Sequence, residues 1–298
     1  MRRLTLLAAA ATAAACAGRA TVSTTPTTRP RVGSAEPTTL RYATGTARYR
    51  VEGLTHTEQE MMGNTAAFDL NTTMLVSTVA SEEAANLSLA ITMDSIAVSG
   101  TAPNLDPQSF AAARAHTFHA LFTPAGRPVS VGSPDSNQPV MVRFQGRVIQ
   151  VSPNAVFEQL ARGFRYFLPA LPPGSISAGA SWSDTVSQAV PIPGGDGTTT
   201  VHSQRQHRIL GWETRDSVRA LHIATTTAIT MSGSGSVQGQ PIELNGTGTS
   251  TMDQFVSAAG VYLGATQTDS TNITVNVLSV GITVPVRQAQ RTTVTRLP

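Results

Sequence analysis

Apolar and polar side chains alternate along most of the chain from about residue 40 onward, and this period of two constrains the fold more than any other feature. One face of the first clear run carries the apolar residues Phe68, Leu70, Met74 and Val76. The same alternation recurs in the segments 47–52, 87–93, 221–229, 273–277 and 282–286. Because successive side chains of a strand point to opposite faces of a sheet, the pattern predicts long, half-buried β-strands. A change of parity between Met93 and Ile96 predicts a β-bulge near Asp94.

These segments together predict a mainly β fold, built on a long antiparallel curved sheet or half-barrel. Glycine-rich turns separate them, as at Asn245-Gly246, and the abundant threonines suit the exposed faces of strands. A proline-rich stretch around residues 171–174 is a candidate boundary. The β-rich domain over 40–298 therefore forms either one lobe or two, 40–172 and 173–298.

Two segments have helical character instead. Residues 152–168 begin with Ser152 as an N-cap and Pro153 at the first helical position, and prolines follow their end. Their apolar residues are spaced at three and four: Val156, Phe157, Leu160, Phe164, Phe167 and Leu168. This predicts an amphipathic helix that covers the apolar face of the sheet. Residues 106–115, which are rich in alanine, predict a second, short helix.

The N-terminus has the layout of an export signal. Residues 1–15 combine two arginines with an apolar run of about a dozen residues, which is too short to cross a hydrocarbon core of ~30 Å. The segment that ends at Cys16, the single cysteine, resembles the lipobox of bacterial lipoproteins. That resemblance implies cleavage before Cys16, acylation of this residue and, because Ala17 is not aspartate, sorting to the outer membrane. The alternative is cleavage after Ala17, which gives a periplasmic or secreted protein without a lipid anchor.

The residues that follow, up to position 39, are rich in Thr, Ser and Pro and contain almost no large apolar side chain. Such a composition cannot build a packed core. We therefore expect residues 16–39 to be a disordered tether between a membrane anchor and the folded domain.

The charge composition excludes several kinds of protein. All 21 basic residues are arginine, so a phosphate-binding loop that ends in Gly-Lys and a Schiff-base lysine are impossible. Without the leader arginines Arg2 and Arg3 the chain has 19 arginines and 18 acidic residues, a net charge of +1. The arginines form no cluster with interleaved aromatic residues, so we expect no nucleic-acid partner.

Motifs for catalysis or metal binding are missing. The histidine pairs His116/His119 and His202/His207 have spacings that put the two rings of each pair on opposite faces of a strand. The sequence contains no Gly-x-Ser-x-Gly elbow, and its few aromatic residues offer little for sugar stacking. We therefore expect no metal, no cofactor and no enzymatic activity, with a secreted hydrolase as the least favoured reading.

A lipobox, a tether and long antiparallel strands with covering helices resemble the half-barrel superfamily of bacterial lipoprotein-localisation factors and lipid-binding lipoproteins. The segments 122–129 and 178–182 are also similar to elements of uncharacterised bacterial lipoprotein families. The resemblance implies a concave apolar face that holds an acyl chain, and therefore a non-enzymatic envelope lipoprotein. The expected ligand-lining residues are Phe68, Leu70, Met74, Leu89, Ile91, Phe157, Leu160, Phe164 and Phe167.

Two other readings stay open. A solid core between sheet and helix would show the same apolar pattern as a ligand cavity. A structural or assembly lipoprotein would use its exposed strand edges to bind another envelope protein.

Overall fold

Thirteen β-strands make up the computed structural model, which describes residues 37–61, 63–101, 114, 116–132, 140–144, 147–151, 161, 163–165, 167–192 and 195–298. In chain order they are β1 (Gly45–Met61), β2 (Asn64–Glu83), β3 (Asn86–Gly100), β4 (Thr117–Phe122), β5 (Pro128–Gly132), β6 (Val140–Phe144), β7 (Arg147–Val151), β8 (Ser181–Pro191), β9 (Gly195–Arg215), β10 (Val218–Val237), β11 (Gln240–Ser257), β12 (Tyr262–Val277) and β13 (Ile282–Arg296). The prediction of a mainly β fold with long antiparallel strands is confirmed, whereas the turn expected at Asn245-Gly246 is wrong, because both residues lie inside β11.

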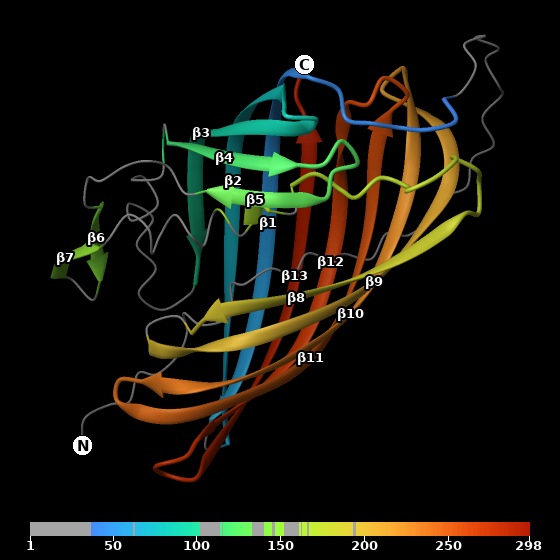
Figure 1. Ribbon diagram of the computed structural model, residues 1–298. Coiled ribbons are helices and arrows are strands. Elements are labelled where there is room, and N and C mark those ends of the chain that lie inside the picture. Colours follow the sequence, from blue (N-terminus) through green and yellow to red (C-terminus); the bar gives the residue numbers. More distant parts are fainter. Residues whose placement is uncertain are drawn as a thin grey trace.

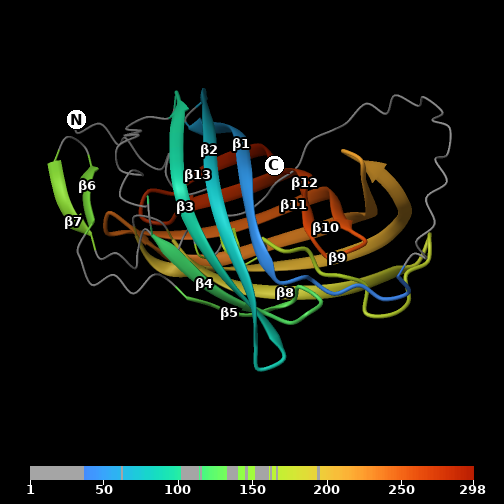
Figure 2. The same cartoon turned by 90° about the horizontal axis from the view of Figure 1, so that it is seen from above.

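Eleven of the strands form one antiparallel sheet in the order β5-β4-β3-β2-β1-β13-β12-β11-β10-β9-β8, while β6 and β7 form a separate hairpin. The order is linear, so within the described residues the sheet does not close on itself. Figures 1 and 2 show the sheet curving so that β4 and β5 at one edge and β8 at the other come round to the same side. The concave side that results is called the inner face below.

In the middle of the sheet, β1 pairs with β13, so the first and last strands of the chain are neighbours. The pairing runs from Tyr49 opposite Arg296 to Gln59 opposite Val286. Pro285 is the first residue beyond this paired stretch, which is where a residue without an N–H group is tolerated. On the other side of β1, the pairs of β2 with β3 skip Asp94, because Leu75 pairs with Ser95 and Val76 with Met93. The bulge predicted near Asp94 is therefore confirmed.

The larger apolar cluster fills the inner face at the end of the sheet where β13 finishes, near the C label in Figure 1. Aromatic rings dominate it. The Phe167 ring lies edge-on to Tyr49 with centroids 5.1 Å apart and is 5.8 Å from Tyr262. Phe164 lies 5.0 Å from Phe118 by the same measure. Phe164, Phe167 and Leu168, which the sequence placed on a covering helix, thus belong to the core.

The helix itself is not supported over its predicted length. Most of 152–168 lies outside the described residues, as does the predicted helix over 106–115 apart from Arg114. What is described forms one helical turn, in which the Arg165 N–H donates to the Ala161 carbonyl at 3.0 Å. The next bond spans only three residues, from the Phe167 N–H to the Phe164 carbonyl, and Pro169 then has no N–H to continue the pattern.

Three long-range hydrogen bonds fix the chain after this turn. The Tyr42 hydroxyl donates to the Pro169 carbonyl at 2.8 Å and is buried, and the backbone N–H groups of Leu171 and Ile176 donate to carbonyls of residues 125 and 38. Gly126 packs against the backbone of Pro169 and has a φ of +77°. A Cβ atom on residue 126 would lie 2.4 Å from the Pro169 carbonyl oxygen. Only glycine fits this close approach.

A second, smaller apolar cluster lies on the inner face at the opposite end of the long strands. Its buried members are Ile192, Val237, Ile242, Leu244, Val275, Val277 and Val284. Several of them come from β10 to β13, so the same strands carry apolar residues at both ends. No helix among the described residues is long and apolar enough to span a membrane.

Candidate functional site

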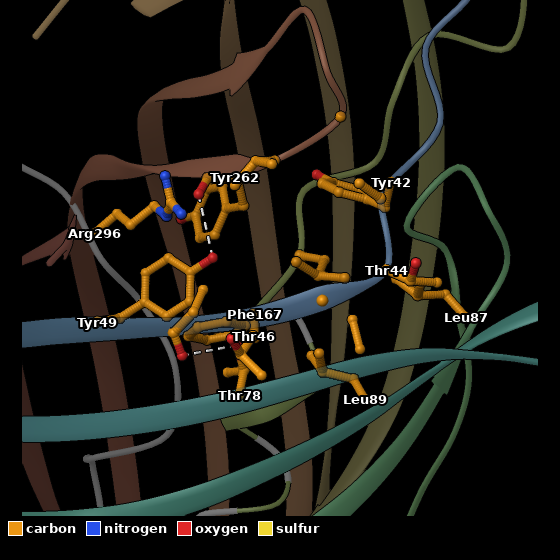
Figure 3. Close-up of a pocket in the computed structure, with 17 residues that line it drawn as sticks. Tyr42, Thr44, Thr46, Tyr49, Thr78, Leu87, Leu89, Phe167, Tyr262 and Arg296 are labelled. Atoms are coloured by element: carbon orange, nitrogen blue, oxygen red, sulfur yellow. Dashed lines mark hydrogen bonds between the residues drawn. The ribbon is translucent and has the colours of Figure 1, made fainter. Parts of the chain in front are cut away.

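A small pocket lies at the edge of the larger cluster, between β1, β2, β3 and the turn before β12 (Figure 3). Its volume is about 70 Å³, and its walls include Tyr49, Leu89, Phe167 and Tyr262. The buried Tyr49 hydroxyl donates to the Tyr262 carbonyl at 3.2 Å and closes one side. Ligand sites for small organic molecules are ≈ 300–1,000 Å³, so this pocket has room for a few water molecules only.

Most of the expected ligand-lining residues meet in the larger cluster. Leu89, Ile91, Phe164 and Phe167 are buried in it, and Leu70 and Met74 pack against it. Phe68 is half-buried on β2 and does not belong to the cluster. Phe157 and Leu160 lie outside the described residues, as does Cys16. The members that lie in the cluster pack together there. The acyl-chain cavity that the sequence predicts there stays a prediction.

A row of polar side chains crosses the inner face between the two apolar clusters. Its members pair directly from strand to strand and come from seven neighbouring strands. In sheet order they are Asp184, Arg205, Thr227, Ser250, Asp269, Gln290 and Thr55. We call this set the polar row. Next to it, on the side of the smaller cluster, Thr271 pairs with Gln288 and Gln288 with Thr57.

A bidentate ion pair and a stacked ring pair lie at the β8 end of the polar row. The Arg205 guanidinium donates to both carboxylate oxygens of Asp184, at 2.6 and 3.0 Å. His207 stacks on Trp182 with ring centroids 4.8 Å apart, and its Nδ1 lies 2.8 Å from the Thr225 hydroxyl. Burial lowers the pKa of His207 against the opposing effect of Asp184, so the ring is neutral at pH 7.

Buried polar groups also lie in the middle of the row and beside it. Asp269 is 2% exposed, and the Ser250 and Gln267 side chains hydrogen-bond to its carboxyl. The Thr271 hydroxyl and the side-chain nitrogens of Gln254 and Gln288 are buried without a partner within the described residues, as are Trp182 Nε1 and His207 Nε2 near the β8 end. Native proteins pair most buried polar groups, because an unpaired one costs ≈ 1–3 kcal/mol or more. Unpaired groups of this kind on the inner face mark it as the candidate site.

The environment of Asp269 disfavours its charge. Burial raises the pKa of this carboxyl from its usual 3.8 to about 7, against the smaller opposing effect of hydrogen bonds from the Ser250 and Gln267 side chains. At neutral pH, therefore, the protonated and ionised forms are both populated. The group can donate a hydrogen bond in one form and accept two or more in the other.

The position of Asp269 in the alternating pattern of β12 is a sequence signal for this site, although it belongs to no known motif. On β12 the alternation that places Ile273 and Val275 on the inner face continues back to Thr271 and Asp269. An acid that shares parity with buried apolar residues is the exception to binary patterning, and such exceptions occur at functional or strained sites. Among the described residues, no group of His, Cys, Asp and Glu side chains is arranged to hold a metal ion.

Comparisons with known proteins identify no family. No family model matches the chain, and no curated protein does. Among solved structures, OccK5 (OpdH) of Pseudomonas aeruginosa matches at 7% identity and a TM-score of 0.30, over 85% of this chain and 98% of the other. OccK2 (OpdF) of the same organism matches at 8% identity and 0.25, over 85% and 98%.

A DUF1329 family protein from Desulfovibrio piger matches at 7% identity and a TM-score of 0.16, over 82% of this chain and 84% of the other. Such low scores establish neither a common fold nor a function. The proposals below therefore rest on the geometry of the inner face.

Proposed function

We propose that this protein is a non-enzymatic binding protein of the cell envelope that holds an amphiphilic ligand against the inner face of its sheet. The observation that carries the proposal is the arrangement of that face. Apolar clusters lie at both ends of the long strands, and between them lie the buried Asp269 and the buried groups of Thr271 and Gln288, which lack partners within the described residues. A ligand with a polar group and apolar parts would complement both kinds of surface.

Native mass spectrometry of the protein purified from its own membranes tests the proposal. We expect a bound mass that organic solvent releases. Replacement of the half-buried inner-face Ile273 by aspartate should abolish the bound mass, whereas the neighbouring Asn272→Asp, on the outer face, should retain it. A protein that carries no ligand and binds no long-chain probe contradicts the proposal.

Export and anchoring are part of the same proposal. The lipobox-like segment supports acylation of Cys16, with the outer membrane as the favoured location and a soluble periplasmic or secreted form as the alternative. The mass of the mature N-terminal peptide distinguishes them. An acylated peptide that begins at Cys16 supports the anchor, and an unmodified peptide that begins at Gly18 contradicts it.

A second function, binding of another envelope protein, is favoured by the open edge of the sheet. In the described part of the structure β8, a strand of eleven residues, pairs with β9 alone and is an edge strand of the sheet. Added strands are a common mode of peptide recognition. Crosslinking in cells from a photoreactive residue at Ser183 should capture a protein partner if this function is the main one.

A further inference from the structure

We propose that His207 is an acid-sensitive latch for the edge strand β8, and that protonation of its imidazole ring loosens β8 from the sheet. Such a device goes beyond the proposed binding function, because it concerns how one edge of the sheet is held and not what the inner face binds. Among the described strands, β8 pairs with β9 alone, so its contacts with β9 decide how firmly it is attached.

The hairpin of β8 and β9 has a closed end and an open end. β8 finishes at Pro191, with three residues between it and the start of β9. At the other end, Ser181 pairs with Arg208, and the Ile209 N–H donates to the Ala180 carbonyl just before the strand. An edge strand opens most easily from the end at which it is not joined to its neighbour, so the side chains near Ser181 control the first step of separation.

Two contacts between side chains hold β8 to β9 near this open end, both on the inner face. Trp182 pairs with His207, and their rings stack with centroids 4.8 Å apart. Asp184 pairs with Arg205 and accepts two hydrogen bonds from its guanidinium, at 2.6 and 3.0 Å. The latch is thus a stacked ring pair next to an ion pair, placed where β8 would begin to leave the sheet.

The His207 ring is poorly placed to carry a second proton. It is 3% exposed, and its Nδ1 lies 2.8 Å from the Thr225 hydroxyl. Its Nε2 is 3.6 Å from a carboxylate oxygen of Asp184, too far for a hydrogen bond, and is buried without a partner among the described residues. A buried charge is costly unless it is paired and hydrogen-bonded, so the attached form of β8 favours the neutral ring.

The charged side chains that face the ring give the same result. Among the described residues they are Asp184 on β8, Arg205 on β9 and Arg127 on the turn between β4 and β5, at the edge that comes round towards β8 (Figure 2). Burial lowers the pKa of His207, and both guanidinium groups add to this effect, whereas Asp184 opposes it. Asp184 is already paired with Arg205, and the facing residue of β10, Thr225, carries no charge.

Separation of β8 removes these constraints. The ring then loses the cover of Trp182 and becomes solvated, so its pKa rises towards the ordinary value of about 6.5. The separated form therefore binds the proton more strongly than the attached form does. The contribution of the neutral ring to attachment is present in full well above pH 6.5 and weakens as pH falls through that value. Acid thus raises the fraction of molecules in which residues 198–208 of β9 are exposed as the edge.

Amide hydrogen exchange of the full-length protein at pH 7.5 and pH 5.5 tests the latch, with rates corrected for the intrinsic effect of pH. We expect the protection of β8 amides to fall at pH 5.5, most at residues 182–185 and least near Pro191. His207→Gln can still bond to Thr225 but cannot take up a proton, so its β8 protection should be the same at both pH values. The matched control is His202→Gln, on the exposed outer face of β9 opposite Ser187, which should lose protection as the wild type does.

A second variant tests the electrostatic part. Arg127→Gln removes one of the two positive charges that oppose protonation, and its exposed side chain can be replaced without disturbing the core. The attached form then tolerates the proton better, so the loss of β8 protection at pH 5.5 should be smaller than in the wild type.

Two outcomes overturn the latch: equal β8 protection of the wild type at both pH values, or the same loss in His207→Gln as in the wild type. If His207→Gln does not fold, Arg127→Gln decides instead. A smaller loss than in the wild type then supports the latch, and an equal or larger loss contradicts it.

Discussion

Replacing Asp269 by asparagine should stabilise the protein at alkaline pH and flatten the dependence of its stability on pH. The buried carboxyl has a pKa raised to about 7, whereas in the unfolded chain it returns to about 3.8. Between these values the folded state binds more protons than the unfolded state does, so stability falls as pH rises. The contribution is present in full below about pH 4 and is lost as pH passes through 7.

The size of the effect follows from the two pKa values. A shift of about three units corresponds to roughly 4 kcal/mol over the whole range, at about 1.36 kcal/mol per unit. Between pH 5.5 and pH 8 the part attributable to Asp269 is roughly 2 kcal/mol, because the folded carboxyl is mostly protonated at the lower pH and mostly ionised at the higher. With a urea m-value of roughly 2 kcal/mol/M, this is a shift of about 1 M in the unfolding midpoint.

Urea unfolding followed by tryptophan fluorescence at the two pH values measures the effect. Stability is compared as variant minus wild type at each pH, so that titration of His207 and of other groups cancels. Asp216→Asn, on an exposed turn, is the matched control for the loss of a carboxylate. A difference of less than about 0.5 kcal/mol for Asp269→Asn would refute the reasoning, because the carboxyl would then be effectively solvated or paired.

Three further predictions concern the packing of the structure and are tested by urea unfolding. Phe167→Ala should cost ~3–5 kcal/mol, because the ring is buried against two tyrosines, and an unchanged stability would show that it faces a cavity. Gly126→Ala should cost ~3 kcal/mol or more, whereas Gly239→Ala, with the same positive φ but open space around it, should cost only about 1 kcal/mol. Asp184→Asn should cost ~1–3 kcal/mol, because the half-buried Arg205 loses one of its two hydrogen bonds and the opposing negative charge, and a neutral result would show that water solvates this pair.

The strands were predictable because each long segment buries one face. The parity of Phe68 to Val76 on β2 matches the inner face, and the parity change at Asp94 matches a real bulge. Both signals are local, and they depend only on the alternation of side chains along a strand. The pairing of β1 with β13 had no such signal, because it joins segments more than two hundred residues apart.

The covering helix shows where local signals mislead. Phe164, Phe167 and Leu168 are buried as the helical spacing requires, yet the described hydrogen bonds amount to one turn followed by a three-residue step. Apolar residues at intervals of three and four mark side chains that share one face of a helix. A single helical turn before Pro169 is enough to place Phe164, Phe167 and Leu168 on one face. Burial was therefore predictable at these positions, whereas the length of the helix was not.

The polar row argues for a function that packing alone does not require. A sheet that only needed stability would place apolar residues between its two clusters, since replacing buried polar groups by apolar ones of similar shape is often neutral or stabilising. Here the strands instead carry Asp184 and Arg205 as an ion pair at one edge and the buried Asp269 four strands away along the same row. Beside Asp269, the Thr271 hydroxyl and the Gln288 side-chain nitrogen are buried without a partner within the described residues. Groups of this kind lower the stability of the free protein, and a ligand that pairs with them would bind more tightly by about the amount that they cost.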